Sequence, residues 1–313
     1  MKAPGVLING RARRASRDRS LPERLRRLVP EEYVHVTGSA EELDVALERL
    51  RKLAVEQLLL VGGDGTVGGT LTPLLRVFAA GGLPLPSVTL SRGGTINTIA
   101  RSLEAAHSPE EALLKLLDEA PPRLDTVRPL VQVEPENAPP RAGMIFVSGV
   151  AARWLELYYE GEDLGPGAAA ALVGRIARSA LTGTRLAREL FERRRVAISV
   201  DGEGLAEAES FTVMGASTVR DIGLGFRPFR TAGSDPERIH FLYTDAGPVR
   251  VSLELPTQRL GLHGPASCLR HHPARTVELR FAAPEAWSVD ADLFPPAQTI
   301  RISAGPQVRF VSY

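Results

Sequence analysis

The sequence contains one cysteine, three lysines and no long uninterrupted apolar run. Because Cys268 is single, an intrachain disulfide framework is excluded and a reducing compartment is favoured. No stretch approaches the about 18 apolar residues that a membrane-spanning helix needs, and the first residues lack the apolar core of a signal peptide. We therefore expect a cytoplasmic protein without a transmembrane segment, and peripheral attachment at the inner membrane surface is compatible with these absences.

Charge is nearly balanced. The formal net charge is +1 at pH 7, so the composition does not indicate a nucleic-acid partner. The length of 313 residues predicts two domains, and 43% hydrophobic residues suffice for two cores. Nearly all basic residues are arginine, and several of them follow the first predicted strand, where a basic loop can neutralise phosphate.

The most informative stretch follows an apolar run at 58–61, which predicts a buried strand. A helix is predicted to begin at Thr70. Between them lie glycines around one carboxylate: Gly62, Gly63, Asp64, Gly65, Thr66, Val67, Gly68 and Gly69. Glycine lets a ligand approach the backbone closely, and the N–H groups at a helix start attract phosphate. The stretch therefore predicts a nucleotide phosphate site.

Strands and helices alternate over the first 125 residues. Strands are predicted at 5–8, 33–36 and 58–61, with a helix over 39–54 that starts at a Ser39–Glu42 capping box. This order predicts a doubly wound parallel sheet that binds ligands at the carboxyl ends of its strands. Asn9 and Thr37 should then lie near the glycine-rich turn. A further strand at 86–90 precedes a second polar turn, which contains Gly94 and Thr95.

From Gly65 to Leu103 the sequence has no Asp or Glu, while Arg76, Arg92 and Arg101 are present. An acid-free segment around two glycine turns favours a polyphosphate ligand. The dinucleotide fingerprint G-x-G-x-x-G matches formally, but it requires an acidic residue about 20 positions further on, which this segment excludes. A Walker A loop is absent.

The segments Gly62-Gly63-Asp64-Gly65-Thr66 and Gly94-Thr95-Ile96-Asn97, followed by Ala-Arg at 100–101, resemble the diacylglycerol kinase catalytic-domain family. This family includes bacterial lipid kinases and sphingosine kinases, and the resemblance covers nearly the whole chain. Asn9-Gly10 is similar to its early Asn-Pro turn, and Thr37 to its nucleotide-contacting threonine. The departures are Gly68 and Gly69 in place of an Asn-Glu pair, and Ile96 and Thr98 in place of a Gly and an Asp.

The part from 126 to 296 has a different pattern. Short β-like runs separated by Gly and Pro predict an antiparallel β-sandwich, with strands at 127–133, 144–147, 195–200, 211–214, 239–243, 249–255 and 276–281. The resemblance implies the same arrangement: an ATP-binding domain over 1–125, a β-rich lipid domain over 126–296, and a return of 297–313 to the first domain through strands at 299–302 and 307–311.

Three features of this second part have alternative interpretations. The basic amphipathic stretch 168–195, with arginines from Arg175 to Arg195, is either a membrane-docking helix, which charge reversal at Arg185 and Arg188 would test, or a helix packed on the sandwich with a solvated arginine face. The aromatic cluster at 154–159 is either an acyl-chain pocket or ordinary core, which is favoured. Cys268, His271 and His272 have metal-like spacing but no further ligands.

Two acids near the end, Asp290 and Asp292, are two positions apart, so on one strand they would face the same side. The family carries a catalytic Asp-Gly-Glu here, which Asp290 and Asp292 match in position. The resemblance implies that Asp292, or Asp290 beside it, accepts the proton of the acceptor hydroxyl while the other orients it or binds Mg²⁺. Asp64 would act through Mg²⁺. A solvated turn before Pro295 is the alternative.

The resulting prediction is an ATP- and Mg²⁺-dependent lipid kinase that transfers the γ-phosphoryl group to a hydroxyl of a lipid such as diacylglycerol or a sphingoid base. The alternatives are an inactive nucleotide- or lipid-binding pseudokinase, a small-molecule kinase similar to NAD kinases, and a purely structural protein. The lipid substrate would be reached at a membrane surface. The sequence leaves a homodimer open.

Overall fold

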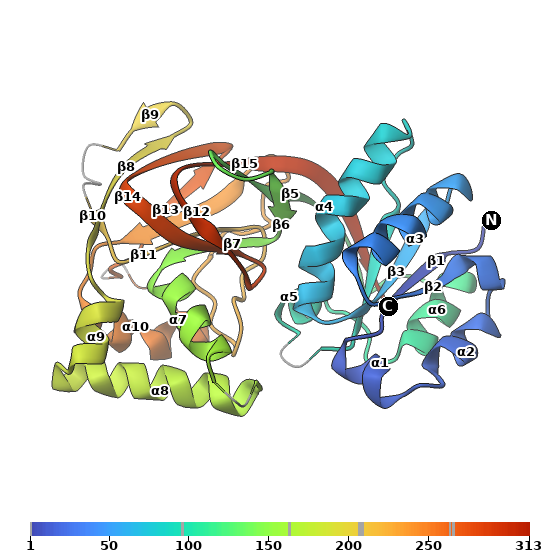
Figure 1. Cartoon of the computed structure of the whole chain (residues 1–313), viewed down its shortest axis with the longest axis horizontal. Coiled ribbons are helices and arrows are strands. Elements are labelled where there is room, and N and C mark those ends of the chain that lie inside the picture. The colour runs from blue at the N-terminus through green and yellow to red at the C-terminus, as the bar shows by residue number, and fades with distance from the viewer. Residues whose placement is uncertain (1, 95–96, 162–163, 206–209, 263, 265–266) are drawn as a thin grey trace. The chain divides into compact units, whose positions relative to one another are not determined.

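The computed structural model describes residues 2–94, 97–161, 164–205, 210–262, 264 and 267–313. The chain forms two compact units, one made of Met1–Arg128 with Pro306–Tyr313 and the other of Pro129–Gly305 (Figure 1). The sequence prediction divided the chain after residues 125 and 296. No loop marks either division in the structure, because two strands, β5 (Leu124–Pro135) and β15 (Asp292–Ser312), continue through them.

The first unit is built on a parallel sheet. Strand β1 lies between β2 and β3, and β4 follows β3, with bounds β1 Gly5–Asn9, β2 Val34–Thr37, β3 Gln57–Gly62 and β4 Ser87–Arg92. The end of β15 adds a further parallel strand through the pairing of Phe310 with Val88. Since the sheet extends in both directions from β1, the predicted doubly wound α/β architecture is confirmed. Residues 299–302, predicted to return here, instead pair with a strand of the second unit.

Helices flank this sheet: α1 Arg13–Arg17, α2 Leu21–Arg26, η1 Glu31–Tyr33, α3 Ala40–Lys52, α4 Asp64–Ala80, α5 Thr98–Ser102 and α6 Pro109–Leu117. The predicted cap of α3 is present, because Ser39 Oγ accepts the N–H of Glu42 at 3.2 Å. Apolar side chains of α2 and α6 pack with one face of β1 and β3 in a shared core, together with Val311 and Tyr313 from the end of the chain.

Helix α4 begins six residues earlier than the sequence predicted, at Asp64 rather than Thr70. Only Gly63 separates it from β3, which ends at Gly62. Thr66 makes this early start stable, because its Oγ1 accepts the N–H of Gly63 at 3.2 Å and so binds a group that the helix leaves unpaired. Gly68 and Gly69 consequently lie within the helix and not in a loop.

The second unit is mainly antiparallel. Its strands pair in the order β13–β12–β11–β7–β14–β15, and β8 also pairs with β14. Their bounds are β6 Arg141–Gly143, β7 Ile145–Gly149, β8 Arg194–Val200, β9 Glu203–Gly204, β10 Ser210–Phe211, β11 Val213–Ser217, β12 Ile239–Thr244, β13 Arg270–Ala274 and β14 Thr276–Val289. The predicted antiparallel β domain is confirmed.

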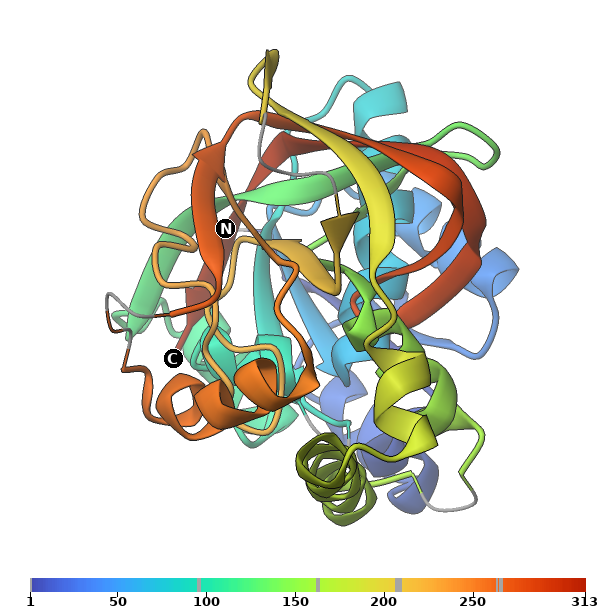
Figure 2. The same cartoon turned by 90° about the vertical axis from the view of Figure 1, so that its left-hand side faces the viewer.

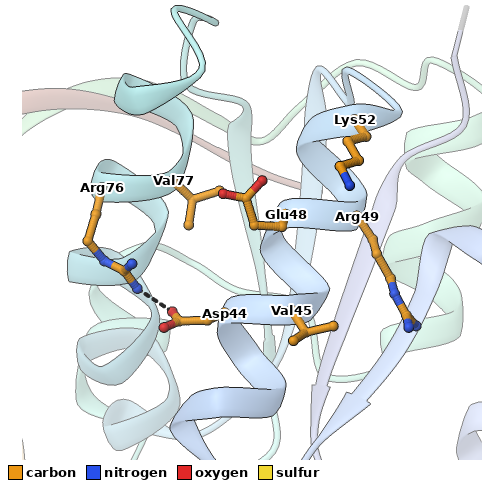
Figure 3. Close-up of a pocket in the computed structure, with 7 residues that line it drawn as sticks. All are labelled: Asp44, Val45, Glu48, Arg49, Lys52, Arg76 and Val77. Atoms are coloured by element: carbon orange, nitrogen blue, oxygen red, sulfur yellow. Dashed lines mark hydrogen bonds and ion pairs between the residues drawn. The ribbon is translucent and has the colours of Figure 1, made fainter.

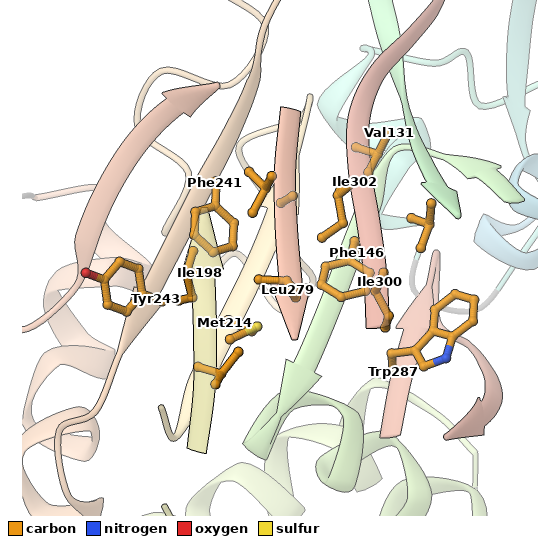
Figure 4. Close-up of a cluster of buried hydrophobic side chains, with 14 of the residues drawn as sticks. Val131, Phe146, Ile198, Met214, Phe241, Tyr243, Leu279, Trp287, Ile300 and Ile302 are labelled. Atoms are coloured by element: carbon orange, nitrogen blue, oxygen red, sulfur yellow. The ribbon is translucent and has the colours of Figure 1, made fainter. Parts of the chain in front are cut away.

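The strands of this unit curve around one apolar interior (Figure 2). Phe146, Trp287, Leu279, Ile300 and Ile302 lie within it, and all five are fully buried (Figure 4). Trp287 stacks on Phe294 with ring centroids 4.6 Å apart. Because strand side chains fill this core, the apolar runs of the sequence could be recognised as strands.

The helices of this unit among the described residues are α7 Val150–Tyr159, α8 Pro166–Thr182, α9 Arg185–Leu190 and α10 Pro248–Leu260. The single helix predicted over 168–195 is two helices, because Gly183 adopts a left-handed conformation (φ 66°) that ends α8. The strand predicted at 249–255 is wrong, since α10 occupies it. Pro248 favours the start of α10, and Gly261 (φ 68°) ends it. No helix among the described residues is both long and apolar enough to cross a membrane.

A buried ion pair fastens α7 and α9 to β14. Arg153 Nη2 lies 2.8 Å from Glu285 Oε1, and these side chains are only 13% and 7% exposed. Arg153 Nη1 also donates to the carbonyl oxygen of Leu190 at 2.8 Å. The second oxygen of Glu285 lies 3.5 Å from Arg194 Nε. The negative charge of the Glu285 carboxylate thus lies beside the positive charges of both Arg153 and Arg194.

We expect Glu285→Gln to lower the free energy of unfolding by roughly 3–5 kcal/mol, because it leaves a buried guanidinium without its countercharge. Urea unfolding followed by tryptophan fluorescence measures this, since both tryptophans, Trp154 and Trp287, lie in the second unit. Glu189→Gln is the matched control. Its partner Arg185 is 88% exposed, so about 0.5 kcal/mol or less is expected. Equal effects in both variants would contradict the prediction.

Candidate functional site

The two glycine turns of the first unit touch at the carboxyl ends of β3 and β4. Gly93 N donates to Gly62 O at 2.8 Å. A Cβ atom on Gly63 would lie 2.7 Å from Gly94 Cα, and one on Gly94 would lie 2.4 Å from Gly63 Cα. Any side chain at these two positions would force the turns apart. The glycines are therefore required for the contact of the two backbones.

Asp64 links the same two turns. Its Oδ2 accepts the N–H of Thr98 at 2.7 Å, and its Oδ1 accepts the N–H of Ile99 at 2.9 Å. The first residue of α4 thereby binds the first turn of α5, across 34 positions of sequence. Burial raises the pKa of the Asp64 carboxyl, and the two N–H donors and Arg101 offset only part of that rise.

Asn9 joins this cluster from the end of β1. Its Nδ2 donates to Thr66 Oγ1 at 2.9 Å, and its Oδ1 accepts the N–H of Arg11 at 2.9 Å. Thr37 lies at the end of β2, where its carbonyl oxygen accepts the N–H of Gly10 at 2.9 Å. The structure thus gathers the polar ends of adjacent strands, as the parallel topology predicted.

The remaining predicted nucleotide residues have different surroundings. Val67 is buried in the core at 3% exposure, and Gly65 is exposed on the first turn of α4. Gly68 lies further along that helix. Thr95, the central residue of the second turn, lies outside the described residues.

Basic groups surround the second turn. Arg14 N donates to Gly93 O at 3.1 Å, and its guanidinium donates to the carbonyl oxygen of His107. Arg92 Nη1 lies 3.1 Å from His107 Nε2. Burial and the charge of Arg101 lower the pKa of Arg92. Arg14 belongs to the basic loop that the sequence analysis placed after the first strand, whereas His107 was not singled out. That loop and the acid-free segment were the two signals that pointed to this cluster.

Arg76 is the third arginine of the acid-free segment, and it forms an ion pair away from the glycine turns. Its Nη2 lies 2.5 Å from Asp44 Oδ1, across a hollow between α3 and α4 (Figure 3). This hollow has a volume of about 290 Å³ and is lined by Asp44, Val45, Glu48, Arg49, Lys52, Arg76 and Val77. Arg76 lies twelve residues after Asp64 in α4, or about 18 Å along the axis at 1.5 Å per residue. It is therefore not part of the glycine-turn cluster.

In the second unit, Asp290 and Asp292 lie at one hairpin but in different surroundings. Asp290 and Ala291 both have positive φ (50° and 72°), as a two-residue type I′ turn requires, and Val289 pairs with Asp292. Asp290 is 3% exposed, and its Oδ1 accepts the N–H groups of Met144 and Ile145 at 2.9 and 2.8 Å. Asp290 lies in the turn after β14 and Asp292 begins β15, so the two acids do not lie on one strand.

Asp292 is the exposed member of the pair. The surrounding protein still removes enough water to raise the pKa of its carboxyl, and the positive charge of Arg141 partly offsets this rise. A carboxylate with a raised pKa is a better proton acceptor than an ordinary one.

Asp201 supplies a structural parallel to Asp290. It also begins a two-residue hairpin turn of positive φ (52°, followed by Gly202 at 88°), between β8 and β9. Its Oδ1 accepts two successive N–H groups, those of Arg275 and Thr276, at 2.8 Å each. Because Asp290 repeats this arrangement, its buried carboxylate is explained by the architecture of the hairpin.

Cys268, His271 and His272 do not converge on one point. His271 Nδ1 lies 2.9 Å from His240 Nε2, His272 stacks on Tyr243 with centroids 5.7 Å apart, and the N–H of Cys268 donates to Glu254. Within the described part of the chain, no three His, Cys, Asp or Glu side chains are grouped so that they could hold a metal ion by themselves.

One comparison with known proteins matches the first unit. Residues 4–128 match the model of the diacylglycerol kinase catalytic domain. The resemblance seen in the sequence is thereby confirmed for the part that holds the glycine turns. None of the curated proteins compared with the chain matches it.

Solved structures extend the likeness in fold to the whole chain. A structure described as a diacylglycerol kinase from Bacillus anthracis is 14% identical, with a TM-score of 0.66, and the match covers 100% of this chain and 97% of that one. Two further Bacillus anthracis structures are each 15% identical, with TM-scores of 0.70 and 0.69, full coverage of this chain and 96% and 97% coverage of theirs. At such low identity these likenesses show the fold alone.

The contact of the glycine turns gives a testable prediction. Gly94→Ala should lower the free energy of unfolding by about 1–3 kcal/mol, because its Cβ would overlap Gly63. Gly69→Ala is the matched control. A Cβ there meets nothing within 4 Å, and alanine favours a helix, so stability should rise by about 0.5–1 kcal/mol. Thermal unfolding followed by circular dichroism distinguishes the two, and a Gly94→Ala protein as stable as wild type would contradict the assignment.

Proposed function

We propose that the protein is an ATP-dependent lipid kinase, which transfers the γ-phosphoryl group of ATP to a hydroxyl of a lipid such as diacylglycerol or a sphingoid base. One observation carries the proposal. Two glycine turns contact each other at the carboxyl edge of a parallel sheet, beside Asp64 and several arginines, within the segment that matches the diacylglycerol kinase catalytic domain. Phosphoryl transfer needs mainly positioning and charge neutralisation, which such a site can supply.

In this proposal the turns hold the nucleotide. Backbone N–H groups at Gly62, Gly63 and the start of α4 bind phosphate, as they do at other strand-to-helix turns. Asn9, Thr37, Thr66, Gly94 and Thr95 complete the site. Arg14 and Arg92 add positive charge. Contacts of Arg14 and Arg92 with Gly93 and His107 already restrict these two arginines. Little further conformational entropy is therefore lost when they bind phosphate.

Asp64 is the proposed Mg²⁺ contact. Each of its oxygens accepts one N–H, and a carboxylate oxygen has capacity for another partner, so Asp64 fits a magnesium ion held through water. Mg²⁺, when bound with ATP, neutralises phosphate charge. Asp64 itself keeps α5 against the first turn, which fixes where the phosphates lie. Asp290 is a weaker candidate as a ligand, because its carboxylate is buried and accepts backbone N–H groups.

Asp292 is the proposed general base. It is exposed and its pKa is raised, and the sequence resemblance implies that it takes the position of the family's catalytic carboxylate. It would accept the proton of the lipid hydroxyl as that oxygen attacks the γ-phosphorus. Asp290 is a positioning residue in this scheme. Its hydrogen bonds to Met144 and Ile145 fix the hairpin that carries Asp292.

The test is transfer of label from γ-labelled ATP to a panel of acceptors: diacylglycerol, monoacylglycerol, a sphingoid base, phosphatidylglycerol and, as the small-molecule alternative, NAD. We expect a lipid product, and Asp292→Asn should lower turnover by about 10²–10⁴-fold, the usual loss when a general base is removed. Its unfolding temperature should stay unchanged, because the side chain is exposed.

Asp201→Asn is the matched control. It should lower stability and retain turnover, since the side-chain contacts of Asp201 are the two backbone N–H groups at its hairpin and an ion pair with Arg238. Three results would refute the proposal: label appearing on NAD alone, ATP binding without transfer to any acceptor, or full activity in Asp292→Asn. The second would identify a pseudokinase, in keeping with the replacement of the family's Asn-Glu pair by Gly68 and Gly69.

The raised pKa of Asp292 predicts the pH dependence. A base works as its carboxylate, so kcat/KM should fall as the pH drops through a pKa above the ordinary value of 3.8. Arg141 lowers this pKa, and Arg141→Gln should therefore move the acidic limb of the profile to higher pH. Arg301 is an exposed arginine on β15, and Arg301→Gln should leave the acidic limb of the profile at the same pH. A shift to lower pH in Arg141→Gln would contradict the assignment of Asp292 as the base.

A further inference from the structure

Helix α10 has its apolar side outward. Val249, Leu253 and Leu260 are 44%, 62% and 70% exposed. With Pro256, also exposed, they follow each other at spacings of four, three and four residues, which places all four on one face of a helix. Gln258 lies on the opposite side and is the one buried residue of α10, at 6% exposure. A helix on the surface of a globular unit normally buries its apolar side and exposes its polar side.

The inward side of α10 is held by polar contacts. Glu254 accepts hydrogen bonds from Ser267 Oγ at 2.8 Å, from the backbone N–H of Cys268, and from Gln258 Nε2 at 3.4 Å. These bonds lower the pKa of the Glu254 carboxyl although burial alone would raise it. The only acid of α10 is therefore directed to the protein, and its orientation fixes the apolar stripe on the outside.

Helix α8 contacts α10 and has charge of a single sign (Figures 1 and 2). It contains no Asp or Glu, and its Arg175 and Arg178 are exposed. Leu181, near its end, is 63% exposed. Arg250 and Arg259 are exposed on α10. We call this surface of exposed leucine, valine and arginine side chains on the two helices the α8–α10 face.

We propose that the α8–α10 face docks the protein on an anionic phospholipid bilayer. Apolar side chains of an interfacial helix enter the boundary of the acyl chains while flanking arginines bind lipid phosphates. A second copy of the chain is a poorer partner, because a symmetric contact would bring like-charged arginines together. The inference rests on the proposed function, because a lipid acceptor lies in a bilayer.

This surface overlaps only in part with the docking stretch 168–195 that the sequence suggested. Helix α8, with Arg175 and Arg178, lies largely in that stretch. Arg185 of α9 forms an ion pair with Glu189 at 2.5 Å, so part of its charge is already neutralised. The proposed contact therefore keeps α8, leaves out α9, and adds α10, a segment that the sequence assigned to a strand.

Co-sedimentation with sucrose-loaded vesicles, without ATP, tests the proposal. The wild-type chain should bind vesicles of phosphatidylcholine and phosphatidylglycerol in equal parts, and bind phosphatidylcholine alone more weakly. Leu253→Gln with Leu260→Gln should weaken binding by at least tenfold, since each leucine contributes apolar burial. Arg175→Gln with Arg178→Gln should weaken it by about fivefold for each charge, on the anionic vesicles only.

Matched controls are exposed residues of the first unit. Val45 and Leu114 are 51% and 44% exposed, so Val45→Gln with Leu114→Gln removes similar apolar surface. Arg26→Gln with Arg27→Gln removes the same charge. Both control proteins should bind as wild type does. Equal losses in the test and control variants would mean non-specific attraction and would overturn the proposal.

Two further measurements separate the explanations. Light scattering after gel filtration detects a dimer, and a dimer that the leucine variant abolishes while vesicle binding persists would assign the face to a second copy and overturn the proposal. Phosphoryl transfer to a detergent-dispersed acceptor should be retained by the leucine variant, because it bypasses docking. If the protein binds vesicles but has no kinase activity, the docking proposal is supported and the proposed function is refuted. If it is fully active but does not bind vesicles, the proposed function is supported and the docking proposal is refuted.

Discussion

A carboxylate that accepts two successive backbone N–H groups is the interaction on which both units depend. Asp64 binds the amides of Thr98 and Ile99, and Asp290 those of Met144 and Ile145. Each joins segments distant in sequence. Charge-assisted bonds of this kind are about twice as strong as neutral ones. Two of the three acids that the family resemblance marks as functional thus also determine where their neighbours lie.

The same interaction separates two carboxylates that a sequence motif treats as a pair. Asp290 is buried and bound to backbone, whereas Asp292, two residues later, is exposed and has a raised pKa. Environments that differ in this way allow one acid to support the chain and the other to exchange protons. The turn of positive φ between them produces the difference.

Local patterns account for what the sequence could predict. Apolar runs such as 58–61 and the Ser39 cap depend on neighbours a few residues away, and both were predicted correctly. Contacts between distant residues decide the rest. Thr66 at the start of α4 is bound by Asn9 from 57 positions away, and the bond from Asp64 to Thr98 spans 34 positions. Helix α10 was mistaken for a strand because its buried side is polar. Its apolar residues therefore did not mark the side of the helix that faces the core.

The end of the chain belongs to the first unit, and this affects how that unit forms during synthesis. Phe310 pairs beside Val88, and Val311 and Tyr313 pack in the core with Val6 and Ile8. All of Pro129–Gly305 must therefore leave the ribosome before the parallel sheet receives its last strand. Closing so long a loop is entropically costly and slow. The first unit, although it begins the sequence, can only be completed last.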